Sequence, residues 1–245
     1  MTHIIGGLRD KEIVMLGLVN RIFVKIQRKV QGIPRGAAHL YDSLAIKYLE
    51  PSYNYIIQDI LEENADKRVI LEIGCGTGVL LSEIAESTNP IVLLGLDISP
   101  AMIKISKKNL VKNDKYSKID LLLADAHKIP LRPRSVDLIV STGTLHHIRD
   151  PETLFKEITI VLGNRGEAWI YEFSHDISIR ELKESSKKLG RPRIFIKLAA
   201  AMHGLPRREC EKGYILEALI KAKASYKLRY NGVITLLKLS RRFDS

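Results

Sequence analysis

Apolar residues recur along the chain in short runs that alternate with longer stretches of helical spacing. The runs are rich in Val, Ile and Leu and lie at residues 69–73, 91–96, 119–124, 136–140 and 168–173. Runs of this length are typical of buried strands, because a buried helix is about twice as long. Strands that alternate with helices predict a parallel sheet covered by helices.

The segments between the runs carry helix and turn signals. Ser99 followed by Pro100 is a typical start of a helix, because Ser caps the first turn and Pro fits its first position. The predicted helices span residues 79–85, 99–110, 150–162 and 209–223, and a turn is predicted at residues 163–166. Near the C-terminus, Asn231-Gly232 predicts a hairpin between residues 225–230 and 233–239.

The first 66 residues predict three more helices, at about residues 11–31, 37–49 and 53–64. In the first of them apolar residues share one face, while Arg and Lys side chains lie on the other. A basic amphipathic helix of this kind either packs on its own domain or lies on a membrane surface. The sequence leaves both alternatives open.

The composition is that of a globular protein with one α/β domain and attached segments. The chain has 245 residues, of which 45% are hydrophobic. It has no apolar run of the roughly 18 residues that a membrane span needs, and no signal-peptide pattern at its N-terminus. Its two cysteines, Cys75 and Cys210, do not make a disulfide framework. We therefore expect a cytoplasmic protein.

The net charge of +11 is concentrated in the last third of the chain. Residues 174–245 hold 17 basic and 7 acidic side chains, whereas residues 67–173 hold 14 and 13. A basic region of this kind predicts an anionic partner or substrate, such as a phosphate, a nucleic acid or an acidic membrane surface. The alternative is a solvated basic surface that binds no ligand.

A glycine-rich segment follows the first predicted strand directly and precedes a helix; it contains Gly74, Gly76 and Gly78. Such a loop brings backbone N–H groups close to a ligand at the positive end of a helix dipole. A dinucleotide-binding loop would have its third glycine at position 79, which is Val79 here. Glu72, at the end of the strand, would repel a pyrophosphate and attract an ammonium or sulfonium group.

Asp97 ends the second predicted strand, where an acid binds ribose hydroxyls in nucleoside-binding sheets. It belongs to a series of four segments in order, which are residues 71–78, 95–100, 124–131 and 136–151. These segments resemble the successive motifs of class I S-adenosylmethionine-dependent methyltransferases. The similarity is closest to the branch that includes ubiquinone- and menaquinone-biosynthesis enzymes and many small-molecule methyltransferases, and it covers residues 67–173 strongly.

The resemblance implies an α/β, Rossmann-like fold: a seven-stranded, mostly parallel sheet with an antiparallel last strand and helices on both faces. It divides the chain into an N-terminal helical cap (1–66), a cofactor-binding core (67–173), a basic helical insertion (174–208) and a last helix with a closing hairpin (209–245). An insertion after the fifth strand lies over the carboxyl edge of the sheet, where α/β folds bind ligands. We expect it to cap the substrate.

The resemblance also implies S-adenosyl-L-methionine as the cofactor. In the family, the acid after the third strand accepts a hydrogen bond from the adenine amino group and the next backbone N–H reads the adenine edge; these are Asp125 and Ala126. Ile98 would pack on the adenine face. The expected cofactor-binding residues are Glu72, Gly74, Cys75, Gly76, Gly78, Asp97, Ile98, Asp125, Ala126, Ser141 and, from the N-terminal cap, Tyr41.

His146 and His147 are the candidate catalytic residues, because they form an adjacent titratable pair in the loop that borders the methyl-transfer chamber of this family. One of them could act as a general base near neutral pH; the alternative is that both only pack the loop. Methyl transfer mainly requires alignment and exclusion of water, so a base is needed only for an acceptor of high pKa. No Cys or His cluster has the spacing of a zinc site.

Three functions are consistent with this pattern. The favoured one is a methyltransferase that acts by in-line displacement on a small or lipid-like, anionic acceptor. The alternative is a methyltransferase for tRNA or rRNA, which the basic last third favours, although the fourth strand lacks the Asn/Asp-Pro-Pro-Tyr motif of enzymes that methylate exocyclic base amines. The third is a non-catalytic S-adenosylmethionine-binding protein, since a glycine loop permits binding without turnover.

Overall fold

The computed structural model of the chain describes residues 51–63, 68–112, 119–202 and 204–241. The helices expected at residues 11–31 and 37–49, and with them Tyr41, lie outside the described residues. The helix expected at residues 53–64 is present and spans residues 51–63. No helix of the described part is long and apolar enough to cross a membrane.

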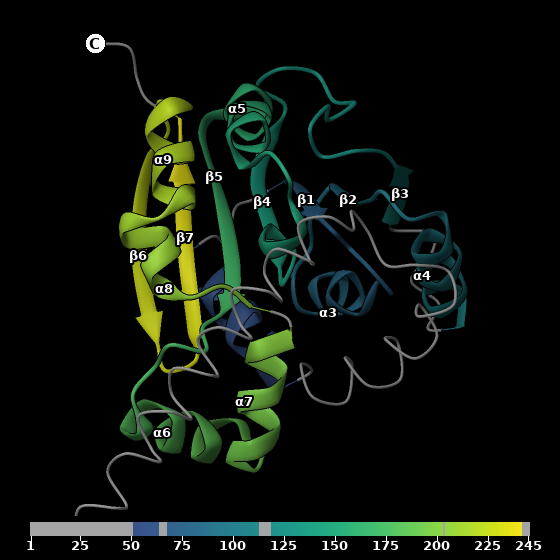
Figure 1. Cartoon of the computed structure of the whole chain (residues 1–245). Helices are drawn as coiled ribbons and strands as arrows, with labels where there is room; N and C mark the ends of the chain where they lie inside the picture. The colour runs from purple at the N-terminus through teal and green to yellow at the C-terminus, as the bar shows by residue number, and fades with distance from the viewer. Residues whose placement is uncertain (1–50, 64–67, 113–118, 203, 242–245) are drawn as a thin grey trace, which may run out of the picture.

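A seven-stranded sheet forms the centre of the fold, with the strand order β3-β2-β1-β4-β5-β7-β6 (Figure 1). The strands are β1 (Val69–Ile73), β2 (Val92–Asp97), β3 (Ile119–Leu123), β4 (Val136–Thr142), β5 (Leu162–Phe173), β6 (Ser225–Asn231) and β7 (Ile234–Ser240). Strands β1 to β5 are parallel, whereas β7 pairs antiparallel with both β5 and β6. The predicted fold class is therefore confirmed.

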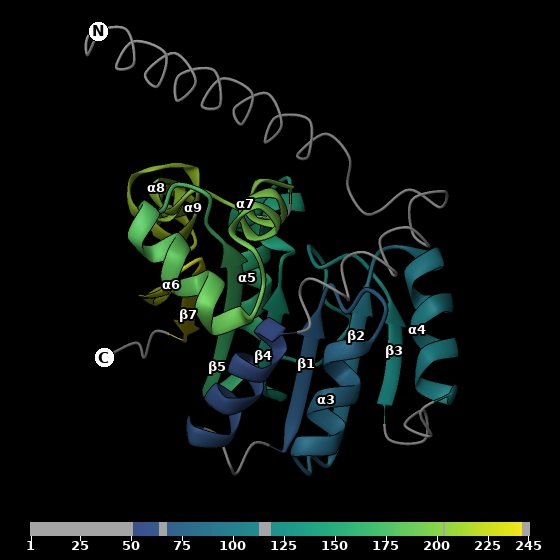
Figure 2. The same cartoon turned by 90° about the horizontal axis from the view of Figure 1, so that it is seen from below.

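Helices cover both faces of the sheet and its carboxyl edge. They are α3 (Val79–Ser87), α4 (Pro100–Lys112), α5 (Pro151–Val161), α6 (Ile179–Leu189), α7 (Arg193–Met202), α8 (Arg207–Lys212), α9 (Tyr214–Lys221) and the short 3₁₀ helix η2 (Leu145–His147). One face is covered by α5, α8 and α9, and the other by α3, α4 and the helix at residues 51–63. Helices α6 and α7 lie across the carboxyl edge (Figure 2).

The central strands are apolar at successive positions because helices cover both faces of the sheet. Successive residues of a strand point to opposite faces of the sheet, so Ile70 and Leu71 of β1 join different apolar clusters. Leu71 packs in the cluster that contains Phe155 of α5, and Ile70 packs in the cluster that contains Leu80 of α3. A strand buried on both faces needs apolar residues at every position. This explains why apolar and polar residues do not alternate along these strands.

The turn predicted at residues 163–166 is wrong, because these residues are part of β5. Val136 pairs with Leu162 and Leu138 pairs with Glu167, so the residues between Leu162 and Glu167 form a bulge in the ladder with β4. A Cβ atom on Gly166 would lie 2.7 Å from the carbonyl oxygen of Val136. The glycines therefore permit a close approach of two strands and do not reverse the chain.

The helix predicted at residues 209–223 is two helices, α8 and α9, which are separated at Gly213. Gly213 has φ −109° and ψ −160°, which is extended backbone. A Cβ atom at this position would lie 2.2 Å from Oε2 of Glu209. Glycine favours a helix less than the residues on either side of it, and a Cβ atom here would also lie 2.7 Å from the Cα atom of Glu209.

Phe155→Ala should destabilise the fold by about 3–5 kcal/mol, because it leaves a cavity in the cluster between α5 and the sheet. The Phe155 side chain is fully buried, with 0% exposure. Ile160→Ala on the same helix is the matched control, since Ile160 is 46% exposed and its truncation should change stability little. Urea denaturation measures both free energies of unfolding. Equal values for the two variants would contradict the assignment of α5 to the core.

Candidate functional site

The glycine loop after β1 is held against the neighbouring strand by its backbone. The N–H groups of Gly74 and Cys75 both donate to the carbonyl oxygen of Leu96, at 2.7 and 3.0 Å. Gly74, Gly76 and Gly78 have φ angles of 73°, 50° and 78°, a region that favours glycine. A Cβ atom on Gly74 would lie 2.2 Å from Oγ1 of Thr144, so the loop also packs closely on the segment after β4.

A pocket opens at the carboxyl ends of β1, β2 and β4, with a volume of about 670 Å³ that includes space open to solvent. The strand order reverses between β1 and β4, and α/β sheets bind ligands at such a switch point. The pocket is lined by Ile73, Gly74, Gly76, Leu96, Asp97, Ile98, Met102, Ala124, Asp125, Ala126, Thr142, Gly143, Thr144, His147 and Ile148. Seven expected site residues therefore lie on one surface.

Four of the expected cofactor-binding residues do not line the pocket, namely Glu72, Cys75, Gly78 and Ser141. Cys75 is buried and packs in the cluster below the loop. Gly78 precedes α3 and approaches Ser106 of α4. The Ser141 hydroxyl donates to the carbonyl oxygen of Ile73 at 2.9 Å, and so joins the ends of β1 and β4. These residues shape the loop and its support.

Asp97 connects the glycine loop to the start of α4. Its Oδ2 accepts from the N–H of Gly76 at 2.9 Å, and its Oδ1 accepts from the N–H of Ser99 at 2.8 Å. Burial raises the pKa of Asp97, and the hydrogen bonds from backbone N–H groups oppose that rise. A carboxylate has about four acceptor sites, so these two bonds leave capacity for hydroxyl groups of a ligand.

Glu72 is a buried carboxyl group that lies behind the loop. In the part of the chain that the structure describes, its Oε2 has no hydrogen-bond partner. Burial raises the pKa of Glu72 well above its usual value, and the charge of Asp97 raises it further. A cation in the pocket would oppose both effects and favour the ionised form.

Asp125 lies at the far side of the pocket, after β3. Its Oδ1 accepts from the N–H of His127 at 2.9 Å and lies 2.6 Å from Nδ1 of the same residue. His127 therefore orients the carboxylate and does not line the pocket. Among the described residues, no group of three or more His, Cys, Asp or Glu side chains is arranged to hold a metal ion.

The two candidate histidines occupy different environments in η2. His147 lines the pocket, whereas the His146 side chain is fully buried. Their rings lie 4.0 Å apart between centroids and are tilted by 44°. Burial lowers the pKa of His146 to about 3, so this ring is neutral at physiological pH. His147 thus lines the pocket, and His146 lies in the support behind it.

Glu172 of β5 supports η2, and the sequence analysis did not identify it. Its Oε1 accepts from the N–H of Leu145 at 2.6 Å, and its Oε2 lies 2.9 Å from Nδ1 of His146. Burial raises the pKa of Glu172 to about 8. Glu172 and His146 therefore share one proton near neutral pH, and the pair has no net charge. The sequence contains one signal that could have identified Glu172: it is an acid within the otherwise apolar strand at residues 168–173.

The comparisons with known proteins point to one type of domain. Residues 71–170 match a family model described as a methyltransferase domain. The malonyl-[acyl-carrier protein] O-methyltransferase of Geobacter sulfurreducens is 28% identical over 182 residues, which are 74% of this chain and 61% of the relative. A protein of the same description from Marinomonas sp. is 33% identical over 96 residues, 38% of this chain and 34% of the relative. The chain thus spans less than two thirds of each relative.

Solved structures share the fold at low sequence identity. A candidate S-adenosyl-L-methionine-dependent methyltransferase from Methanococcus maripaludis has a TM-score of 0.70 and 21% identity, and the match covers 86% of this chain and 94% of the other. A SAM-dependent methyltransferase from Aquifex aeolicus has a TM-score of 0.59 and 17% identity, with 84% and 98% covered. PigF, solved with SAH, has a TM-score of 0.62 and 18% identity, with 85% and 60% covered.

Glu172→Gln should flatten the pH dependence of stability above pH 4.5. The folded-state pKa of Glu172 lies above its ordinary value of 4.5, so its stabilising contribution is complete below pH 4.5 and is lost as the pH rises through about 8. The glutamine amide imitates the protonated carboxyl group. Melting temperatures between pH 5 and pH 9 measure the effect.

Glu172→Ala is the contrasting variant, because it leaves the N–H of Leu145 and the ring of His146 without this acceptor. It should destabilise the protein by about 1–3 kcal/mol at every pH. The Glu172→Gln protein could instead lose stability with rising pH as steeply as the parent. That result would contradict the raised pKa of Glu172.

Proposed function

We propose that the chain is a class I S-adenosylmethionine-dependent methyltransferase that transfers a methyl group to a small or lipid-like, anionic acceptor; the match of residues 71–170 to a methyltransferase domain model and the shared fold support this. The pocket at the switch point of the sheet carries the proposal. It joins the glycine loop, Asp97 and Asp125, each from a different strand end, to His147 of η2. Fold alone would not suffice, since one fold serves many functions.

The pocket suits a nucleoside that carries a cation. Asp97 lines its β1–β2 side, and Glu72 lies buried behind the glycine loop, where its Oε2 has no hydrogen-bond partner among the described residues. This arrangement opposes a pyrophosphate and favours the sulfonium and ammonium groups of S-adenosylmethionine. The close approach of Gly74 to Thr144 leaves no room for a side chain at position 74.

In this proposal, different residues of the pocket bind different parts of the ligand. Asp97 accepts from ribose hydroxyls while it holds the N–H of Gly76. Asp125 accepts from the adenine amino group, and the N–H of Ala126 reads the adjacent ring edge. Ile98 packs against one face of the adenine ring. Each role rests on the family resemblance and on the position of the residue in the pocket.

The protein's part in the reaction is mainly positioning. S-adenosylmethionine supplies an electrophilic methyl group on a sulfonium centre, so the chain needs to align an acceptor and exclude water. Thr142, Gly143 and Thr144 form the pocket wall after β4, and His147 follows them. His147 is the residue placed to accept a proton from an acceptor of high pKa. His146 and Glu172 fix the turn that presents it.

The nature of the acceptor is the finer part of the proposal. Two relatives are described as malonyl-[acyl-carrier protein] O-methyltransferases, which supports a carboxylate on a thioester-linked chain as one acceptor to test. The basic insertion at residues 174–208 supports an anionic acceptor independently. Its helices α6 and α7 cross the carboxyl edge of the sheet, which suits a substrate cap (Figure 2).

Asp97→Ala should weaken the binding of S-adenosylhomocysteine about tenfold or more, because ribose hydroxyls and the N–H of Gly76 lose their shared acceptor. Titration calorimetry measures the dissociation constant. Asp120→Ala is the matched control, since Asp120 is an exposed acid on β3 and should bind like the parent. Unchanged affinity of the Asp97→Ala protein would refute the ribose assignment.

A methyl-transfer assay tests the function itself. The full chain is incubated with methyl-labelled S-adenosylmethionine and, separately, with malonyl-acyl carrier protein, malonyl-coenzyme A and bulk tRNA. We expect label on a malonyl thioester. We also expect the His147→Ala variant to bind S-adenosylhomocysteine normally. Label on tRNA would favour the RNA alternative. Binding without transfer to any of the three would contradict the carboxylate acceptor and support the non-catalytic alternative.

A further inference from the structure

Asp125 begins a tight turn that follows β3. Its carbonyl oxygen accepts from the N–H of Lys128 at 2.9 Å, and its Oδ1 accepts from the N–H of His127 at 2.9 Å. Asp favours such turns, because its side chain accepts from a backbone N–H two residues later. Both bonds use backbone N–H groups as donors, so the turn itself needs no particular side chain at position 127.

The His127 ring adds a contact that the turn does not require. Its Nδ1 lies 2.6 Å from Oδ1 of Asp125. A carboxylate can only accept hydrogen bonds, so this ring nitrogen carries a proton and donates. The Asp125 side chain is 43% exposed, and a side chain of this exposure has several rotamers open to it. Two donors on one oxygen select a single rotamer, and His127 therefore holds the carboxylate in one orientation.

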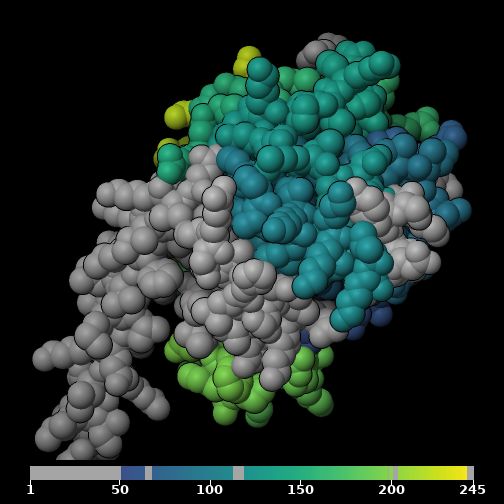
Figure 3. Space-filling model, turned by 90° about the vertical axis from the view of Figure 1, so that its right-hand side faces the viewer, coloured from purple at the N-terminus to yellow at the C-terminus, as the bar shows by residue number. Residues whose placement is uncertain are grey.

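The turn is attached to α5, which keeps the His127 ring in place. The N–H of Ile129 donates to Oε2 of Glu157 at 2.9 Å, and the Ile129 side chain packs in the apolar cluster on the α5 face of the sheet. Hydrogen bonds from Thr153 lower the pKa of Asp150 at the start of α5, and the charge of His127 lowers it further. The teal atoms in the space-filling view of Figure 3 show that this part of the chain lies at the surface, so bonds rather than burial hold it.

The turn has a fixed position in the pocket. Asp125 and Ala126 line the pocket, and the N–H of Ala124 donates to the carbonyl oxygen of Asp97 at 3.1 Å. In the proposed function, Asp125 accepts from the amino group at C6 of adenine. A 6-oxopurine has a carbonyl oxygen at that place, and two acceptors that face each other leave both without a donor. The orientation of Asp125 therefore decides between the two kinds of base.

We propose that His127 is a positioning residue that makes the pocket selective for adenine over a 6-oxopurine, because it holds the Asp125 carboxylate toward the edge of the base. A site that hydrogen-bonds its ligand rejects an analogue that leaves the polar groups of the site unpaired. A carboxylate that can turn away loses this discrimination. The role of His127 rests on the proposed function, since it requires the adenosine part of the cofactor in the pocket, and it holds whichever acceptor is methylated.

The test is titration calorimetry of the full chain with S-adenosylhomocysteine and with S-inosylhomocysteine, which has an oxygen in place of the 6-amino group. We expect the parent to bind the adenine compound at least about tenfold more tightly. The His127→Leu protein should bind S-adenosylhomocysteine about fivefold more weakly than the parent, and S-inosylhomocysteine as the parent does or more tightly. A merely structural role of His127 would weaken both affinities by the same factor.

Two further variants act in the same turn. His127→Asn is the conservative variant, because the Asn amide nitrogen lies about as far along the side chain as Nδ1 of His and also donates. It should bring the ratio of the two affinities to within about twofold of the parent. Lys128→Leu is the matched control, since Lys128 is exposed and contributes a backbone N–H that the substitution keeps. Its ratio should equal that of the parent.

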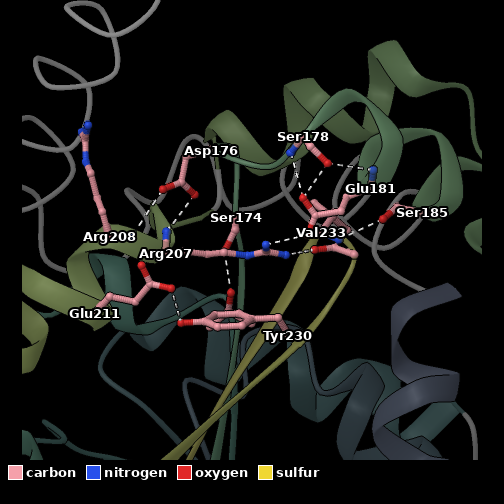
Figure 4. Close-up of polar contacts among 12 residues, drawn as sticks. Ser174, Asp176, Ser178, Glu181, Ser185, Arg207, Arg208, Glu211, Tyr230 and Val233 are labelled. Carbon is pink, nitrogen blue, oxygen red and sulfur yellow. Dashed lines mark hydrogen bonds and ion pairs between the residues drawn. The ribbon is translucent and has the colours of Figure 1, made fainter.

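A control at the other end of the sheet separates selectivity from stability. Figure 4 shows the Arg207 guanidinium at the base of the insertion, where it donates to Glu181 of α6 and to the carbonyl oxygen of Gly232 in the β6–β7 hairpin. Strand β6 is the edge strand opposite β3. Arg207→Ala should lower the melting temperature by at least about 3 °C and leave the ratio of the two affinities unchanged.

The outcomes distinguish this inference from the proposed function. An unchanged ratio of affinities in the His127→Leu protein would overturn the role of His127 and leave cofactor binding intact. Equal binding of both compounds by the parent would overturn it as well, because Asp125 would then not read the 6-amino group. A parent that binds neither compound would refute the proposed function and the role of His127 together.

Discussion

The candidate site depends on one constraint: the backbone after β1 must lie against β2 and against the segment after β4. Two N–H groups of the glycine loop share the carbonyl oxygen of Leu96, and Asp97 accepts from a third N–H at Gly76. On the other side, Ser141 holds Ile73 and Thr144 packs on Gly74. These contacts need a glycine at position 74, where Thr144 leaves no room for a side chain, and they place the ends of three strands around one pocket.

Buried acids give this region its electrostatic character. Glu72, Asp97 and Glu172 are 2%, 8% and 3% exposed, and burial raises the pKa of each of them. None of them forms an ion pair with Lys or Arg in the described part of the chain, so their charge is balanced by protons or by a bound cation. Buried acids of this kind cost stability, and they are found where function requires them.

The insertion between β5 and β6 is attached to the sheet at its base. Arg207 and Ser185 attach the base to the β6–β7 hairpin, which the sheet itself supports. On the same insertion, Ile196 and Ala200 of α7 pack in the cluster that contains Trp169 of β5. The insertion therefore has a fixed position at the edge of the sheet.

The sequence by itself determined the fold class and the loop residues of the site. The runs around Ile70, Leu94 and Ile139 require burial on both faces, and the glycines after β1 require close approach of a ligand or a second segment. Such signals are local, since they depend on the spacing of neighbouring residues.

Only the tertiary structure decided which of these residues meet. It separated His147 from His146, turned the Gly163–Gly166 segment into a bulge, and broke the helix at Gly213. It also brought Glu172 to η2, although 26 residues separate it from His146 in the chain. The bulge and the position of Glu172 depend on contacts between segments distant in sequence, and neither propensity nor spacing carries information about such contacts.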